Sequence, residues 1–81
     1  MNNKVLKDAL IEKLTTSKRH LWETPDLAQG HMEHEGHYPV TEDAGYRRVL
    51  RALNDLENVG EVASYTTVMN GRVWWLKSRV N

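Results

Sequence analysis

The densest group of side chains capable of chemistry lies between residues 31 and 37. Three histidines, His31, His34 and His37, are interspersed there with Glu33 and Glu35. Imidazole and carboxylate groups are zinc ligands, but no pair here has the spacing of a known zinc signature, and a glycine interrupts the run. We therefore expect no cofactor and favour a polar loop, with zinc binding or a pH response through the three histidines as alternatives.

Nucleophilic and phosphate-binding motifs are not found elsewhere in the chain. Ser17, Ser64 and Ser78 stand in no nucleophile motif, and no glycine-rich phosphate loop is present. The chain has no cysteine, which excludes disulfides and thiolate chemistry. Since 81 residues leave little room for a buried cleft, we expect that this protein is not an enzyme.

Charge is unevenly distributed along a chain whose formal net charge is zero. Segments 1–22 and 47–81 each carry a net charge of +3, whereas segment 23–46 carries −6 and contains no Lys or Arg. A fold can bring the two basic segments to one face, and local potential governs attraction to phosphate more than net charge does.

Length and hydropathy limit the architecture and the compartment. Eighty-one residues predict one domain spanning 1–81. No apolar run approaches the ~20 residues that span a membrane, and no signal peptide is recognised. The expectation is a cytoplasmic protein without a membrane partner.

Apolar spacing predicts three helices. The first covers residues 4–15, the second residues 25–32 behind a Thr24 N-cap, and the third runs from a Thr41 cap to Gly60, with Glu42 and Asp43 in its first turn. The residues expected to face the core are Val5, Leu6, Ala9, Leu10 and Leu14 on the first helix, Leu27 and Ala28 on the second, and Tyr46, Val49, Leu50, Leu53 and Leu56 on the third.

Strands are predicted at residues 20–23, 61–69 and 72–80, the last two flanking Asn70-Gly71. That dipeptide favours a two-residue type I′ hairpin turn. Such a turn pairs Tyr65 with Leu76 and Thr67 with Trp74, directs these four side chains to the core, and leaves Arg72 at the tip. Trp22 is also expected in the core, and Trp75 on the opposite face of the hairpin.

The segment from Tyr46 to Val62 reads YRRVLRALNDLENVGEV, and residues 70–76 read NGRVWWL. The first resembles the third helix and following strand of winged helix-turn-helix regulators of bacteria, archaea and their viruses, and the second is similar to their wing. The resemblance implies an α+β winged helix, with a three-helix core and a C-terminal hairpin. The connection over residues 30–40 is longer than a tight helix-turn-helix turn.

The same resemblance implies double-stranded DNA as partner and transcription regulation as function, with the third helix in the major groove. Arginine suits guanine edges and phosphate, and asparagine suits adenine. The expected DNA contacts are Arg47, Arg48, Arg51 and Asn54 on the helix, Arg72 on the wing, and Lys77, Lys18 and Arg19 at phosphates. Glu42 and Asp43 oppose this interpretation, because they would repel phosphate at the end of the helix that enters the groove.

Two alternatives remain open. The outward face of the third helix could be an ordinary solvated surface carrying an Arg51–Asp55 pair. A winged helix can also bind proteins instead of DNA, which neutral charge, the acidic middle segment and an exposed Trp75 would fit. Trp75 or Ile11 could equally seed a homodimer.

Overall fold

The structure is a computed structural model that describes residues 3–33, 42–69 and 71–79. These residues form three α-helices, a three-stranded antiparallel sheet and a final 3-10 turn. In chain order the elements are α1 (Asn3–Thr16), β1 (Trp22–Glu23), α2 (Thr24–Ala28), α3 (Ala44–Asn58), β2 (Val62–Thr66), β3 (Arg72–Leu76) and the 3-10 turn Lys77–Arg79. The expected α+β class is confirmed. None of the described helices is long and apolar enough to cross a membrane.

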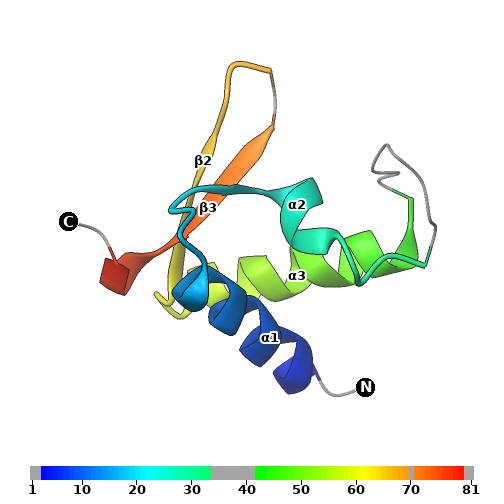
Figure 1. Ribbon diagram of the computed structural model, residues 1–81. Coiled ribbons are helices and arrows are strands. Elements are labelled where there is room, and N and C mark those ends of the chain that lie inside the picture. Colours follow the sequence, from blue (N-terminus) through cyan, green and yellow to red (C-terminus); the bar gives the residue numbers. More distant parts are fainter. Residues whose placement is uncertain (1–2, 34–41, 70, 80–81) are drawn as a thin grey trace.

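Helix α3 is the centre of the arrangement. In Figure 1, α2 lies above α3 and α1 below it, and the β2–β3 hairpin projects away from the helices. The sheet order is β1-β3-β2, so the short strand β1 pairs with the returning strand of the hairpin. The sheet thereby joins the segment before α2 to the segment after α3.

One apolar core links all these elements. Trp74 is its largest fully buried side chain, and its indole N–H donates to the Thr24 hydroxyl at 2.8 Å. The other buried apolar residues are Leu10, Leu14, Leu27, Ala28, Val49, Ala52, Leu53, Leu56, Val62 and Leu76. Most were expected from their spacing. Val5 is a correction: it is 73% exposed, because the helix side that it occupies is not covered.

Helix α2 is shorter than expected and is capped differently. It ends at Ala28, before Gly30, whose φ of +91° is unfavourable for other residues. Thr24 is not the N-cap: Glu23 occupies that position and makes no side-chain cap bond. The Thr24 hydroxyl is instead buried against Trp74, where satisfying an indole N–H in the core takes precedence over capping.

Helix α3 begins at Ala44 with Asp43 as its N-cap, whereas the predicted cap, Thr41, lies outside the described residues. The Asp43 Oδ1 atom accepts from the backbone amides of Gly45 at 2.8 Å, Tyr46 at 3.2 Å and Glu33 at 3.0 Å. The last of these bonds ties the segment after α2 to the start of α3.

The end of α3 agrees with the prediction. Gly60 has φ +85°, and its amide donates to the Glu57 carbonyl, while the Glu61 amide donates to the Leu56 carbonyl at 2.9 Å. These two bonds form a Schellman motif, which needs a left-handed residue and so favours glycine. The motif turns the chain directly into β2.

The hairpin register differs from the one that the Asn70-Gly71 dipeptide predicted. Thr66 pairs with Arg72, Ser64 with Trp74 and Val62 with Leu76, so residues 67–71 connect the paired positions. A slip by an odd number of residues reverses the two faces of β2. Tyr65 therefore lies on the outer face and is 61% exposed, whereas Val62 enters the core. Burying Val62 against the helices outweighs the local preference for a two-residue turn.

Candidate nucleic-acid interface

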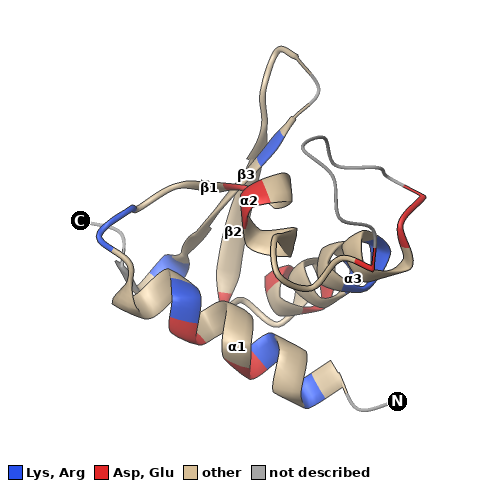
Figure 2. Ribbon diagram, turned by 45° about the vertical axis from the view of Figure 1, so that its right-hand side comes forward, with Lys and Arg blue, Asp and Glu red and all other residues tan. Residues whose placement is uncertain are grey.

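The outward face of α3 carries the best-placed group of basic and amide side chains. Its opposite face is buried through Val49, Ala52, Leu53 and Leu56. At ~100° per residue, the side farthest from that buried face holds Arg47, Arg51, Asn54 and Asn58. Arg47, Arg51 and Asn58 are exposed and Asn54 is half-buried. Figure 2 shows that basic residues occupy the N-terminal half of α3 and acidic residues its C-terminal half.

The two arginines at the centre of this face point to solvent. Within the described ranges, neither the Arg47 nor the Arg51 side chain makes a hydrogen bond or an ion pair. Arg51 does not form the pair with Asp55 that the alternative of a solvated helix face included, and the Asp55 carboxylate instead lies 3.4 Å from the Lys7 ammonium of α1. Both guanidinium groups are therefore available to an external anion.

Most of the acidic residues near α3 are engaged in contacts within the fold. The Asp43 carboxylate, which the sequence presented as an obstacle to phosphate, is buried and serves as the helix cap. Glu57 is paired with Arg72 at 2.9 Å and Asp55 with Lys7. Glu42 is exposed at the start of the helix and remains a source of repulsion there.

Arg48 points away from the exposed arginines. Its Nη2 atom lies 3.5 Å from the Glu33 carboxylate, and the side chain lines a cavity beside α1. Its position on the helix, about 100° from Arg47, accounts for this difference. Of the three arginines expected to act together, the structure brings two to the same face.

Arg72 is the clearest departure from the expected site. The observed register places it within β3 and not at the hairpin tip. Its guanidinium donates to Asn54 Oδ1 at 2.9 Å, to Glu57 Oε1 at 2.9 Å and to Ser64 Oγ at 3.0 Å, and it lies 4.5 Å from the centre of the Trp74 ring. Arg72 therefore connects α3 to both strands of the hairpin.

Glu57 and Ser64 were not singled out from the sequence. The Ser64 hydroxyl also donates to the Glu57 carboxylate, which completes the network around Arg72. These contacts span between 7 and 18 residues of sequence, so no local pattern could have revealed them. The available signal was the register itself, because pairing Ser64 with Trp74 puts Ser64 and Arg72 on neighbouring positions of adjacent strands.

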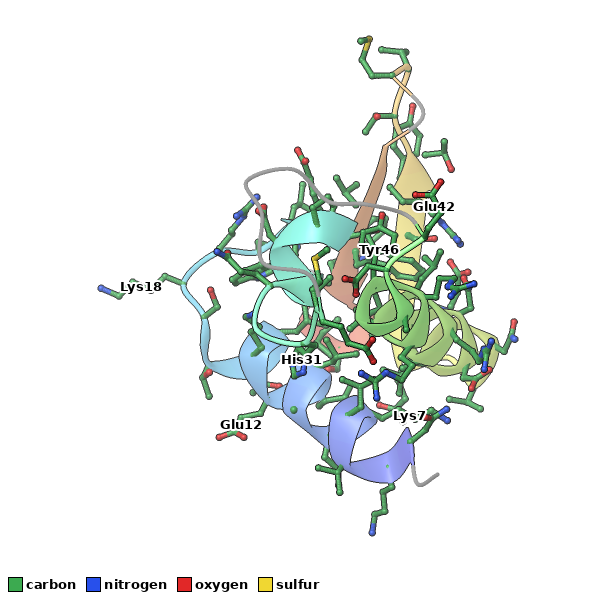
Figure 3. The ribbon with its side chains drawn as sticks, turned by 90° about the vertical axis from the view of Figure 1, so that its right-hand side faces the viewer. Lys7, Glu12, Lys18, His31, Glu42 and Tyr46 are labelled. Atoms are coloured by element: carbon green, nitrogen blue, oxygen red, sulfur yellow. The ribbon has the colours of Figure 1, made fainter. Side chains whose placement is uncertain are left out.

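The remaining basic candidates lie apart from this face. Arg19 pairs with Asp26 at 2.9 Å and packs 4.9 Å from the ring centre of Trp22, which is half-buried and not a full core residue. Figure 3 shows Lys18 projecting on the side of the molecule away from α3. Lys77 is exposed at the start of the 3-10 turn Lys77–Arg79, directly after β3.

The hairpin offers apolar surface near the tip, where Arg72 was expected. Val68 and Met69, after β2, are 94% and 86% exposed. On the outer face of the sheet, a shallow groove is lined by His20, Leu21, Tyr65, Val73 and Trp75. Trp75 does point away from Trp74, as expected, but it is only half-exposed.

His31 is the one member of the histidine cluster that the structure describes. It lies between α1 and the start of α3 (Figure 3), in the wall of a cavity of about 260 Å³ that Leu6 and Arg48 also line. Burial lowers the pKa of its imidazole below the ordinary value, and the positive charges of Lys13 and Arg48 lower it further. A protonated His31 is thus disfavoured in the folded state.

The described residues include no group of three histidine, aspartate or glutamate side chains that could hold a metal ion. His34 and His37 lie outside the described residues, so zinc binding through the cluster is neither supported nor contradicted.

The close approach of the His31 carbonyl to Gly45 leaves no space for a side chain at position 45.

Comparison with known proteins gives no relative from which a role could be transferred. No model of a known protein family matches the chain, and neither a curated protein nor a solved structure is significantly similar to it.

Proposed function

We propose that this protein is a winged-helix DNA-binding domain that acts as a transcription regulator. Helix α3 would lie in the major groove, and the β2–β3 hairpin would be the wing beside it. The order helix, strand, helix, helix, hairpin and the pairing of β1 with β3 support this assignment. The residues proposed to contact DNA are those on the outward face of α3.

The observation that carries the proposal is that the arginines on the outward face of α3 are exposed while most nearby carboxylates are paired or buried. Arg47 and Arg51 are exposed one helical turn apart, while the carboxylates of Asp43, Asp55 and Glu57 are engaged within the fold. Phosphate binding depends on local positive potential, and a net charge of zero does not prevent it. In the major groove these two arginines would reach guanine edges or phosphates.

The other basic candidates have smaller proposed roles. Lys77 would meet a phosphate at the edge of the interface, whereas Lys18 and Arg19 would contact only DNA that bends around the domain. Arg48 would contribute only through long-range electrostatic attraction to DNA, because its guanidinium is directed toward Glu33. The proposed interface therefore depends mainly on Arg47, Arg51 and Asn54.

The test is binding of the protein to mixed-sequence duplex DNA over a salt series. Counterion release predicts a linear fall of log K with log salt, with a slope of about −0.9 for each phosphate contacted. The double substitution Arg47→Ala/Arg51→Ala should abolish binding or flatten this slope by about two phosphate contacts.

The matched control is Lys4→Ala/Lys13→Ala, which removes two positive charges from α1, outside the proposed interface. It should bind nearly as the wild type does. Equal losses in the two double variants would mean that only net charge matters, and no binding at low salt would refute the proposed function.

A second candidate is a winged-helix module that binds protein, including a second copy of itself. The exposed apolar surface of Leu21, Tyr65, Val68 and Met69 favours it, since such surface is costly to leave in water. Sedimentation of the wild type and of Tyr65→Ser tests self-association. A dimer that the substitution dissociates would support this second candidate. A wild type that is monomeric at all concentrations would exclude a homodimer.

A further inference from the structure

The contact between Arg72 and Asn54 fixes how the Asn54 amide is turned. A guanidinium group has only donors, so the atom that it approaches at 2.9 Å must be the carbonyl oxygen, Oδ1. The NH₂ end of the amide then points the other way. No described residue accepts a hydrogen bond from that NH₂, although Asn54 stands on the outward face of α3.

The guanidinium is itself held from several directions. Its Nη2 atom donates to Glu57 on α3 and to Ser64 on β2, and its central carbon lies 4.5 Å from the centre of the Trp74 ring. Trp74 is fully buried and donates to Thr24, whose hydroxyl also donates to the Arg72 carbonyl at 3.4 Å. Arg72 is therefore immobilised through α2, α3 and both strands of the hairpin.

The orientation of the amide matters because the purines differ at the edge that faces the major groove. Guanine presents two acceptors, N7 and O6, whereas adenine presents the N7 acceptor and an N6 donor. An asparagine reads adenine by accepting from N6 with its oxygen while donating to N7. An amide whose oxygen is turned toward Arg72 offers donors only, and these match guanine.

We propose that Arg72 is a positioning residue that sets the base preference of Asn54, turning its amide so that it favours guanine over adenine. This inference rests on the proposed function, because it assumes that α3 enters the major groove. It differs from a direct wing contact, in which the Arg72 guanidinium would bind a phosphate and leave the base preference of Asn54 unchanged.

The experiment is selection of bound duplexes from a randomised pool, followed by sequencing, with the wild type and four variants. Asn54→Ala identifies the base position that Asn54 reads, because the preference there disappears. At that position the wild type should favour guanine over adenine by roughly tenfold, the discrimination expected of one good base contact.

Arg72→Lys keeps the positive charge, but a single ammonium group cannot span Asn54, Glu57 and Ser64 as a guanidinium does. It should shift the preference at the Asn54 position toward adenine by roughly tenfold, with other positions unchanged. In the double variant Asn54→Ala/Arg72→Lys, the preference should equal that of Asn54→Ala alone, as expected when one residue acts through the other.

Ser64→Ala removes one anchor of the guanidinium without altering its charge, so it gives a smaller shift in the same direction. Circular dichroism checks that each variant is folded. If Arg72→Lys is unfolded, Ser64→Ala still tests the inference. A guanine preference unaffected by Arg72→Lys, or adenine favoured by the wild type, would overturn the inference.

The outcomes also separate this inference from the function on which it rests. If the wild type enriches no duplex, both fail. If it enriches duplexes through Arg47 and Arg51 while Asn54→Ala alters no position, DNA binding stands and the positioning role of Arg72 is refuted. A fall in the salt slope of Arg72→Met by about one phosphate contact would assign Arg72 to the DNA backbone instead.

Discussion

At the scale of single residues, contacts across the fold decide which basic side chains remain available to a ligand. Sequence spacing correctly predicted that Arg47 and Arg51 face outward, because both the buried face and the helix period were readable. It could not predict that Arg72 binds Asn54 and Glu57, since that contact depends on a strand register set by distant residues. Two expected DNA contacts, Asn54 and Arg72, are thus partners of each other.

His31 makes the stability of the protein depend on pH. Its pKa is lowered in the folded state, so the unfolded chain binds a proton more readily. Its contribution to stability is complete above the unfolded pKa of about 6.5 and is lost as pH falls through that value toward the folded pKa. When the pH is lowered from about 7.5 to about 5, the free energy of unfolding should therefore fall less in His31→Gln than in the wild type.

Urea unfolding followed by tryptophan fluorescence at the two pH values measures this difference. His20→Gln is the matched control, because it removes an exposed histidine from outside the cavity. The same pH dependence in His31→Gln and in the wild type would contradict the assignment.

At the scale of elements, local signals predicted α3 well and the hairpin poorly. The apolar spacing and Gly60 defined α3 because capping and helix periodicity are local properties. The dipeptide Asn70-Gly71 is also a local signal, but the register is decided by Val62 and Trp74 entering a core formed by other elements. The length of α2 was overestimated at its C-terminal end, because the helix stops at Ala28, before Gly30 with its φ of +91°.

Asp43 should be the most important capping residue of α3. Its buried carboxylate accepts from three backbone amides, two in the first turn and one at Glu33. Asp43→Ala should lower the free energy of unfolding by about 2 kcal/mol, the upper part of the range for lost N-caps, because it leaves these amides without an acceptor.

Asp43→Asn supplies the control for this prediction, because its amide oxygen can still accept these bonds. It should retain most of the stability that Asp43→Ala loses, as measured by thermal unfolding. Equal stability of the alanine variant and the wild type would show that the cap does not hold α3 to the segment after α2.

At the scale of the whole molecule, the basic side chains that the structure describes do not form one continuous face. Arg47 and Arg51 of α3 lie on one side, Lys18 projects on another (Figure 3), and the ion pairs Lys7–Asp55 and Arg19–Asp26 neutralise part of the remainder. The segment charges were readable from the sequence, but their partners were not, because each pair joins different elements. A compact basic patch on α3 predicts a small footprint on DNA.

The most direct test of a DNA-binding α3 is a residue-by-residue map of contact. We would titrate isotope-labelled protein with a short mixed-sequence duplex at low salt and follow the backbone amide resonances. The proposal predicts the largest shifts at Arg47, Arg51 and Asn54 and along the β2–β3 hairpin, with α1 little affected. Shifts confined to Leu21, Tyr65 and Trp75, or no shifts with excess duplex, would contradict it.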